Sequence, residues 1–256
     1  MTTSGKKTLD RALARTGACS RSVARAAIAA GRVQVNGRTV RDPDTWVDPV
    51  RDRLALDGSA AQAARKEVWM LHKPTGLVTT ARDEHGRDTV YALLPPDLPW
   101  LAPVGRLDQD TSGLLLFTND SDLAHSITEP ATELAKTYEA ECRGELGADA
   151  LQQLAAGVLL ADGPTRPARV ERLGGDARTT RLRLVITEGR NRQVRRMLTA
   201  VGSRVLALHR TRIGPLQLGD LPVGACRRLD RAEVAALRAA VSAVPNRPRT
   251  NRGRAR

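Results

Sequence analysis

The sequence predicts an α+β protein in two parts: a small N-terminal α/β module, and a larger domain whose mixed, mainly antiparallel sheet is flanked by helices. Two observations predict this class. Strand-like and helix-like segments are mixed along the chain without the strict alternation that parallel sheets require. In addition, a run of small and polar residues at 57–66, DGSAAQAARK, separates the two parts like a linker.

The N-terminal module, expected at residues 7–56, begins with two helices. Apolar residues recur at helical spacing from Leu9 up to Gly17, which provides a C-cap. Ser20 then caps a second helix that runs to Gly31. The module therefore starts as a compact helical pair.

A short sheet is predicted to follow the helical pair. The residues at 33–35 alternate between apolar and polar and lead into Asn36-Gly37, the strongest short hairpin signal. Thr39-Val40 begins the return strand, and residues 54–56 offer a further short strand.

Residues 67–242 are expected to form the second domain. Its periodic segments predict strands at 68–71, 77–80, 114–117, 138–142 and 181–186, and helices at 149–156 and about 190–201. The last residues, 243–256, are basic, polar and broken by Pro and Gly, which predicts a disordered tail.

The charge of the chain points to a polyanionic partner. Forty-one Lys and Arg against 28 Asp and Glu give a formal net charge of +13. Such an excess favours nucleic acid, because cations near phosphates release bound counterions. No apolar run approaches the roughly 18 residues of a spanning helix, and the first residues do not resemble a signal peptide. We therefore expect a cytoplasmic protein without a membrane partner.

The three cysteines do not suggest a metal site. Cys19, Cys142 and Cys226 are isolated from one another, and none belongs to a C-x-x-C pair or lies beside a histidine. We expect them to be reduced. With one Phe, two Tyr and three Trp, the chain also lacks the aromatic residues for an extended stacking platform.

The segment Gly105-Arg-Leu-Asp108-Gln-Asp110-Thr-Ser-Gly113 is the strongest candidate for a site, because it combines two carboxylates, a cation and glycines just before an apolar strand. The residues alone leave two interpretations open. In one, Asp and Thr side chains only cap backbone amides in a turn. In the other, Asp108 and Asp110 are a glycosidase-like pair. That chemistry needs about 5 to 9 Å between carboxylates across a sugar, and nothing else indicates a sugar cleft.

The first part of the chain resembles a known RNA-binding module. Two helices followed by Gly31-Arg-Val-Gln-Val-Asn-Gly37 and a short sheet resemble the S4 module, over residues 8–56. The resemblance implies that the helix pair docks on structured RNA, although a merely solvated charged face is the alternative. The phosphate-binding residues selected from this face are Arg11, Arg21, Arg25 and Arg32.

Three motifs in the second part resemble those of the ribosomal-RNA pseudouridine synthase family whose members carry an N-terminal S4 module. The segment from Gly105 matches the catalytic motif G-R-L-D-x-D-T-S-G-L-L. Lys136-Thr-Tyr138 matches K-x-Y, and the run from Glu188 to Met197 matches E-G-x-x-R-Q-V-R-R-M. Together with the module, the resemblance covers residues 8–230.

The resemblance implies a reaction that detaches uracil from its ribose, turns it and rejoins it through carbon, with no redox change and no cofactor. Asp108 acts on the target nucleotide as nucleophile or base, and both roles need an ionised carboxylate. Arg195 pairs with Asp108 and keeps it ionised. Tyr138 stacks on the extruded base, and Arg106 fills the space that the base leaves.

The same motifs imply supporting residues. Asp110 and Thr111 hold the loop in shape. The third motif adds further contacts to substrate RNA, with its arginines on phosphates; these residues are Arg192, Gln193 and Arg196.

A non-enzymatic S4-containing RNA-binding protein is the alternative from another class, and it accounts for the charge, the hairpin and the tail. It does not account for the three motifs. Asn191-Arg192 stands where some relatives have Tyr-His, which favours large-subunit (23S) ribosomal RNA as the substrate. We expect the enzyme to act on it as a monomer.

Overall fold

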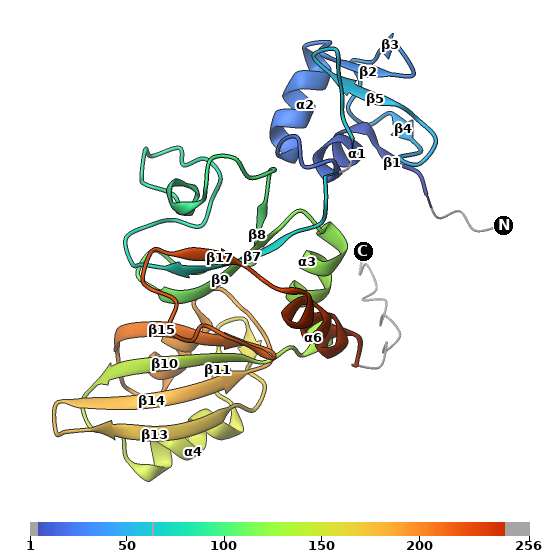
Figure 1. Cartoon of the computed structure of the whole chain (residues 1–256). Coiled ribbons are helices and arrows are strands. Elements are labelled where there is room, and N and C mark those ends of the chain that lie inside the picture. Colours follow the sequence, from blue (N-terminus) through green and yellow to red (C-terminus); the bar gives the residue numbers. More distant parts are fainter. Residues whose placement is uncertain (1–4, 63, 244–256) are drawn as a thin grey trace.

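The computed structural model describes residues 5–62 and 64–243, which form a small N-terminal module and a larger domain built on one sheet (Figure 1). The predicted α+β class, with a mainly antiparallel mixed sheet and flanking helices, is confirmed. The tail expected at 243–256 lies outside the described residues except for Ala243. None of the helices in the described ranges is both long enough and apolar enough to span a membrane.

In the module, α1 (Leu9–Arg15) packs against α2 (Arg21–Ala29). Ser20 is the expected N-cap, because its hydroxyl accepts a hydrogen bond from the N–H of Val23 at 3.2 Å. The apolar residues that predicted the helices meet in one core with the strands; among them are Leu9, Leu13, Ala24, Ile28, Val33 and Leu54.

The strands of the module form two small sheets. A four-stranded sheet has the order β3-β2-β5-β6, and β1 pairs separately with β4. Their bounds are β1 Lys7–Thr8, β2 Val33–Val35, β3 Arg38–Thr39, β4 Trp46–Val47, β5 Leu54–Leu56 and β6 Ser59–Ala60.

The linker predicted at residues 57–66 begins later than expected. Asp57 and Gly58 have φ of 51° and 78° and form the two-residue turn between β5 and β6. Asp-Gly is the same kind of hairpin signal as the Asn36-Gly37 turn between β2 and β3. The folded module therefore extends to Ala60.

The larger domain contains a nine-stranded sheet with the path β13-β14-β10-β15-β9-β7-β17, to which β8 adds on β9 and β16 adds on β15. Every pair is antiparallel except β9 with β15. The bounds are β7 Val68–Lys73, β8 Ala102–Val104, β9 Ser112–Thr118, β10 Lys136–Arg143, β13 Arg169–Gly175, β14 Thr179–Ile186, β15 Val205–Ile213, β16 Leu216–Gln217 and β17 Cys226–Arg228.

Helices cover the sheet in two groups. The core beneath α4 and α5 contains Leu154, Met197 and Leu198, and that beneath α3 and α6 contains Leu123 and Leu237. The remaining elements are α3 Ser121–Thr128, α4 Ala148–Ala156, α5 Gln193–Ala200, α6 Arg231–Ser242, the short helices η1 Val90–Leu93 and η2 Pro130–Thr132, and the pair β11 Leu159–Leu160 with β12 Gly163–Pro164.

Two predicted elements differ from the structure. The strand expected at 77–80 is a loop with a single bridge from Val78 to Thr89, because the polar residues that follow fold around Asp83 instead of pairing in a ladder. The helix expected from residue 190 begins at Gln193, because Arg192 has a left-handed φ of 47° and cannot continue a helix.

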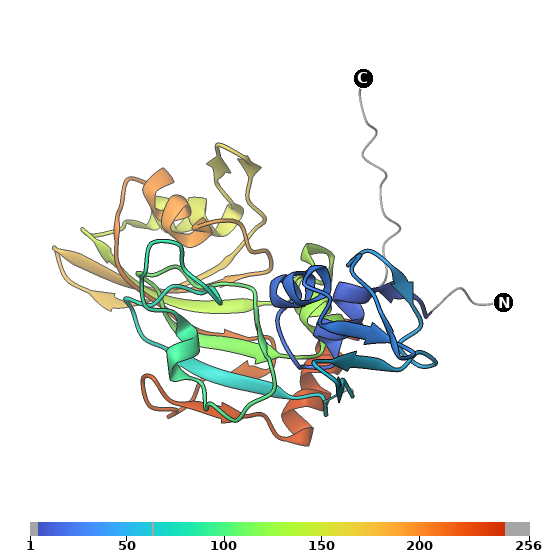
Figure 2. The same cartoon turned by 90° about the horizontal axis from the view of Figure 1, so that it is seen from above.

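The module contacts the larger domain beside α3, as Figure 2 shows from above. The N–H of Trp100 donates to the carbonyl of Gly17 at 2.8 Å. The guanidinium of Arg15 donates two hydrogen bonds to the carboxylate of Asp122, at 3.0 and 2.9 Å. These contacts place α1 against the start of α3.

Candidate active site

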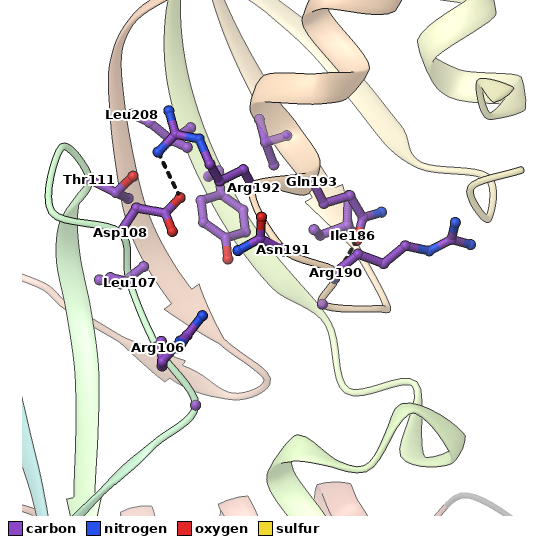
Figure 3. A pocket seen from close by; sticks show the side chains of 14 residues that line it. Arg106, Leu107, Asp108, Thr111, Ile186, Arg190, Asn191, Arg192, Gln193 and Leu208 are labelled. Carbon is purple, nitrogen blue, oxygen red and sulfur yellow. Dashed lines mark hydrogen bonds and ion pairs between the residues drawn. The ribbon is translucent and has the colours of Figure 1, made fainter. Parts of the chain in front are cut away.

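A cavity of about 310 Å³ brings together segments that are far apart in the chain (Figure 3). It is called the Asp108 pocket below. Asp108 comes from the loop between β8 and β9, Tyr138 from β10, and Arg192 from the loop before α5. The lining residues are Gly105, Arg106, Leu107, Asp108, Thr111, Tyr138, Ile186, Gly189, Arg190, Asn191, Arg192, Gln193, Val194 and Leu208.

A close approach of two backbones fixes the end of the Asp108 loop. A Cβ atom on Gly113 would lie 2.3 Å from the carbonyl oxygen of Arg210, so only glycine fits. Here β9 and β15 pair in parallel, but only through two residues of each strand. The preceding part of β15, including Leu208, is left to line the pocket.

Lys73, at the end of β7, holds the loop from beneath. Its side chain is fully buried, and its ammonium donates to the carbonyls of Asp108 at 3.1 Å and Thr111 at 2.9 Å. A third bond reaches the carbonyl of Pro74 at 2.9 Å. Burial lowers the pKa of Lys73 to about 8, while the carboxylates of Asp108 and Asp110 act in the opposite direction. The sequence analysis did not select Lys73, although a lysine at the end of an apolar strand could have indicated a buried functional cation.

Further hydrogen bonds tie the Asp108 loop to the segment after β7. The hydroxyl of Thr79 donates to the carbonyl of Leu107 at 2.8 Å and accepts its N–H at 3.3 Å. Gly76 and Gln109 are joined twice, because the N–H of Gly76 reaches the Gln109 carbonyl and the Gln109 amide reaches the Gly76 carbonyl. The backbone around Asp108 is thus fixed on both sides, as an active-site loop requires.

The expected pair between Asp108 and Arg195 is not what the structure shows. Arg192 is the cation next to Asp108, with its Nη1 atom 3.6 Å from Oδ2 (Figure 3). The left-handed backbone of Arg192 directs its side chain over the loop, where it also donates two hydrogen bonds to Asp110, both at 3.1 Å.

Arg195 lies one turn further along α5 and contacts the next part of the loop. Its Nη2 atom donates to the carbonyl of Asp110 at 2.7 Å and lies 3.2 Å from the Asp110 carboxylate. It also reaches the hydroxyl of Thr111 at 3.3 Å. Burial of Asp110 acts to raise its pKa, but Arg192 and Arg195 outweigh burial and lower it. Asp110 and Thr111 thus connect the loop to α5.

Tyr138 faces the Asp108 pocket from β10 and is backed by a buried arginine that the sequence analysis did not select. Arg210, in β15, donates from Nη1 to the Tyr138 hydroxyl at 3.4 Å, and its guanidinium lies 5.9 Å from the ring centroid. Its Nε atom donates to the carbonyl of Leu114 at 2.8 Å. Arg210 therefore links Tyr138 to β9. No local sequence signal separated it from the many other arginines.

The remaining residues of the third motif take different positions. Gln193 is buried, and its amide oxygen and nitrogen bond to the N–H of Arg190 and the carboxylate of Glu188, so it braces the loop before α5. Arg196 forms a two-bond pair with Asp162 and does not line the Asp108 pocket. A direct contact of either residue with RNA remains a prediction.

Arg106 is exposed and lines both the Asp108 pocket and a neighbouring cavity of about 470 Å³. The two cavities also share Asp108 and Arg192. Within the described ranges, the Arg106 side chain forms no ion pair. It is therefore free to contact a nucleotide at the entrance.

Several of the module arginines that were predicted to bind phosphate are already paired with aspartates. Arg21 and Arg25 both donate to the buried carboxylate of Asp10, and Arg32 pairs with Asp57. Arg11 forms no ion pair among the described residues. The basic face is thus partly neutralised by aspartates from neighbouring elements, which the sequence spacing did not reveal.

Potential metal ligands do not gather near the pocket. No group of three or more His, Cys, Asp or Glu suited to a metal ion occurs in the part of the chain that the structure describes. The three cysteines are free thiols, and burial raises the pKa of Cys19, Cys142 and Cys226.

Comparisons with known proteins agree with this fold. The family model for RNA pseudouridylate synthase matches residues 67–200, and that for the S4 domain matches residues 7–51. The chain therefore belongs to the RNA pseudouridylate synthase family and is an enzyme of that class with an S4 domain at its N-terminus. The family expected from the three motifs is confirmed.

Individual relatives match over nearly the whole chain. Ribosomal large subunit pseudouridine synthase B of Bacillus subtilis is 37% identical over 90% of this chain and 95% of its own length. An RNA pseudouridine synthase of Mycobacterium leprae is 40% identical over 90% of this chain and 91% of its own. A crystal structure of a pseudouridylate synthase aligns with a TM-score of 0.66 and 33% identity, over 90% of this chain and 99% of that one.

Proposed function

We propose that this enzyme converts one specific uridine of large-subunit (23S) ribosomal RNA to pseudouridine, with Asp108 as the catalytic carboxylate. The observation that carries the proposal is the position of Asp108, in a pocket that Tyr138 and Arg192 also line, with Nη1 of Arg192 3.6 Å from its carboxylate. The ribosomal substrate is supported by the similarity to the large-subunit synthase B of Bacillus subtilis.

The reaction needs a group that attacks or deprotonates the nucleotide and a pocket that holds the free base. The bond from ribose to N1 of uracil breaks, the base turns, and a bond from the same ribose carbon to C5 forms. The proton on C5 leaves and N1 gains one, so atoms and electrons balance without a redox partner. Asp108 acts as the nucleophile or as the base that removes a ribose proton, and Arg192 is the cation beside its carboxylate.

The other residues of the pocket suit a flipped nucleotide. A uridine within a helix is inaccessible, so it must leave the stack before reaction. Tyr138 offers its ring to the extruded base, with Arg210 fixing the hydroxyl end. Arg106, exposed at the entrance, occupies the space that the base leaves. Arg195 positions the loop through Asp110 and is not assigned a contact with the reacting atoms.

The two parts of the chain have separate tasks under this proposal. The module, to Ala60, docks on structured RNA through its free cations, with Arg11 foremost, and the domain at 67–242 carries out the reaction. We place the enzyme in the cytoplasm, where ribosomal RNA is modified, and expect it to work as a monomer.

The test is to map pseudouridines in both ribosomal RNAs from cells that lack this enzyme, and from the same cells carrying the gene for the wild-type protein or for Asp108→Asn. We expect one site in 23S RNA to disappear, and to return only with the wild-type protein. Loss of a site in 16S RNA would overturn the 23S assignment. Loss of no site would favour a non-enzymatic RNA-binding role.

A further inference from the structure

Another cavity, of about 530 Å³, lies between the module and the larger domain and is separate from the Asp108 pocket. It is called the interdomain cleft below. One wall comes from β1, α1 and α2, and the other from Trp100, β8, the end of β9 and α3. The lining residues are Lys7, Arg11, Ala14, Arg15, Arg21, Trp100, Ala102, Thr118, Asn119, Ser121, Asp122, Ala124 and His125.

The cleft contains a rigid aromatic ring. Trp100 stacks on Tyr91, with ring centroids 4.9 Å apart and planes 10° from parallel. Tyr91 is itself fixed, because its ring meets the buried ring of Phe117 edge-on and its hydroxyl donates to the carbonyl of Leu101 at 2.9 Å. Tyr91 covers one face of the indole, while Trp100 also lines the cleft. A preordered ring of this kind can stack on a nucleobase of any sequence.

The charge around this ring is positive. Four cations line the cleft, and Asp122 is the one carboxylate among its lining residues. Arg15 is engaged by Asp122 and Arg21 by Asp10. Lys7 and Arg11 form no ion pair within the described parts of the chain. An aromatic platform beside free cations matches a nucleotide, with its apolar base and anionic phosphate.

The cleft and the Asp108 pocket lie near each other along two segments. Ala102 at the start of β8 lines the cleft, and Gly105, directly after β8, lines the pocket about 10 Å away at ~3.3 Å per residue. On α3, His125 lines the cleft, and Thr128 at the end of the helix lies 3.7 Å from the Cβ position of Gly105. A stacked strand advances about 3.4 Å per nucleotide, so roughly three stacked nucleotides would span the gap between these lining residues.

We propose that the interdomain cleft binds one unpaired nucleotide of the RNA substrate, with its base against Trp100 and its phosphates facing Lys7 and Arg11. This inference rests on the proposed function and adds a second point of recognition to it. The enzyme would then read the spacing between two unpaired nucleotides, one flipped into each site. Such spacing selects a loop by its shape, as proteins that recognise single-stranded RNA do.

Substitution of Trp100 tests the stacking. In assays with 23S RNA, Trp100→Ala should raise KM about 5- to 150-fold and leave kcat unchanged, because the cleft lies outside the reacting atoms. Trp100→Phe keeps a ring and should retain most of the affinity. Thermal unfolding of each variant checks that loss of the Tyr91 contact has not unfolded the domain.

Substitution of Arg11 tests the phosphate contact without touching the core. Arg11→Ala should weaken RNA binding and reduce the slope of log K against log salt by about one. Arg178→Ala is the matched control, because this exposed arginine lies in the turn between β13 and β14, away from the cleft, and should leave affinity and slope close to wild type. An Arg11 variant that matched the control in both measurements would contradict the phosphate contact.

A scan with abasic nucleotides identifies the occupant. A fragment of 23S RNA that contains the target uridine is made with a single abasic position, which is stepped through the neighbouring nucleotides. At one position, the abasic nucleotide should raise KM for the wild-type enzyme. The same abasic nucleotide should not raise KM further for Trp100→Ala, because removing both partners of one contact costs no more than removing either partner. Additive effects at every position, or a folded Trp100→Ala enzyme with wild-type KM, would overturn the proposal. Absence of pseudouridine with the wild-type enzyme would instead overturn the proposed function.

Discussion

The module and the catalytic domain each contain a charged side chain with no exposed surface, Asp10 in the first and Lys73 in the second. Asp10 accepts hydrogen bonds from Thr8, from the N–H of Arg11, and from the guanidinium groups of Arg21 and Arg25. All of these partners lie within 15 residues of it. Lys73 instead donates to carbonyls of the Asp108 loop, 35 and 38 residues away.

The two buried charges have opposite electrostatic settings. Burial acts to raise the pKa of Asp10, but its hydrogen bonds, two of them from cations, outweigh burial and lower the pKa to about 2. Lys73 has only neutral carbonyls as direct partners, so burial prevails and its pKa falls to about 8. The charge of Asp10 therefore stabilises the module, whereas the charge of Lys73 is maintained at a cost. We infer that burying the charge of Lys73 lowers the stability of the catalytic domain, while its hydrogen bonds hold the Asp108 loop in place.

The largest expected effect is on kcat, the rate of the chemical step, and follows from substitution of Asp108. Asp108→Asn should reduce kcat by at least about 1,000-fold, because the group that acts on the nucleotide is lost. Binding of RNA should stay close to wild type, because affinity comes from cations elsewhere in both regions. Single-turnover kinetics and RNA-binding titrations measure the two separately. Turnover at the wild-type rate would refute the role of Asp108.

The next largest effect is expected for Arg192, and it distinguishes the role of Arg192 from that of Arg195. Arg192→Ala should lower kcat/KM about 10- to 150-fold, because the charged contacts at Asp108 and Asp110 are worth roughly 1.5–3 kcal/mol. Arg195→Ala should act mainly on stability, through its lost bond to the Asp110 carbonyl. Steady-state kinetics and thermal unfolding of both variants distinguish these outcomes. A larger loss of kcat in Arg195→Ala would restore the pairing with Asp108 that the motif implied.

Lys73→Met should impair both folding and activity. It leaves three carbonyls without their donor, which costs about 1–3 kcal/mol for each buried group that water cannot reach. In the wild-type enzyme the folded pKa of Lys73, about 8, lies below the ordinary 10.5, so the unfolded state binds more protons between these values. The free energy of unfolding should therefore rise with pH across that window. Urea titrations at several pH values should find this rise reduced in Lys73→Met.

Asp10→Asn should have the smallest effect, confined to stability. The folded pKa of Asp10, about 2, lies below its ordinary 3.8, so its contribution is present above pH 3.8 and is lost as the pH falls through 2. The shift corresponds to about 2 kcal/mol. Urea titrations between pH 6 and 2 should find the wild-type and variant curves converging at low pH, with pseudouridine formation at pH 7 retained. A constant difference at all pH values would contradict this account of Asp10.

Much of the module was predictable because its determinants are local. The Ser20 cap, the Asn36-Gly37 turn and the helical spacing from Leu9 each act within a few residues, and each forms as predicted. The same local chemistry at Asp57-Gly58 was overlooked, which placed the linker too early. The loop at 77–80 could not be separated from a strand, because its pairing depends on Asp83 and Arg87 further along.

The sequence by itself determined the α+β class, the family and the identity of Asp108 and Tyr138 as pocket residues. These predictions rest on local periodicity and on contiguous motifs, which can be recognised without knowing how the chain folds in space. Only the tertiary structure decided that Arg192 and not Arg195 lies beside Asp108, and that Lys73 and Arg210 support the loop and Tyr138. The physical reason is that the direction of a side chain depends on backbone angles, such as the left-handed turn at Arg192, and on the pairing of distant strands.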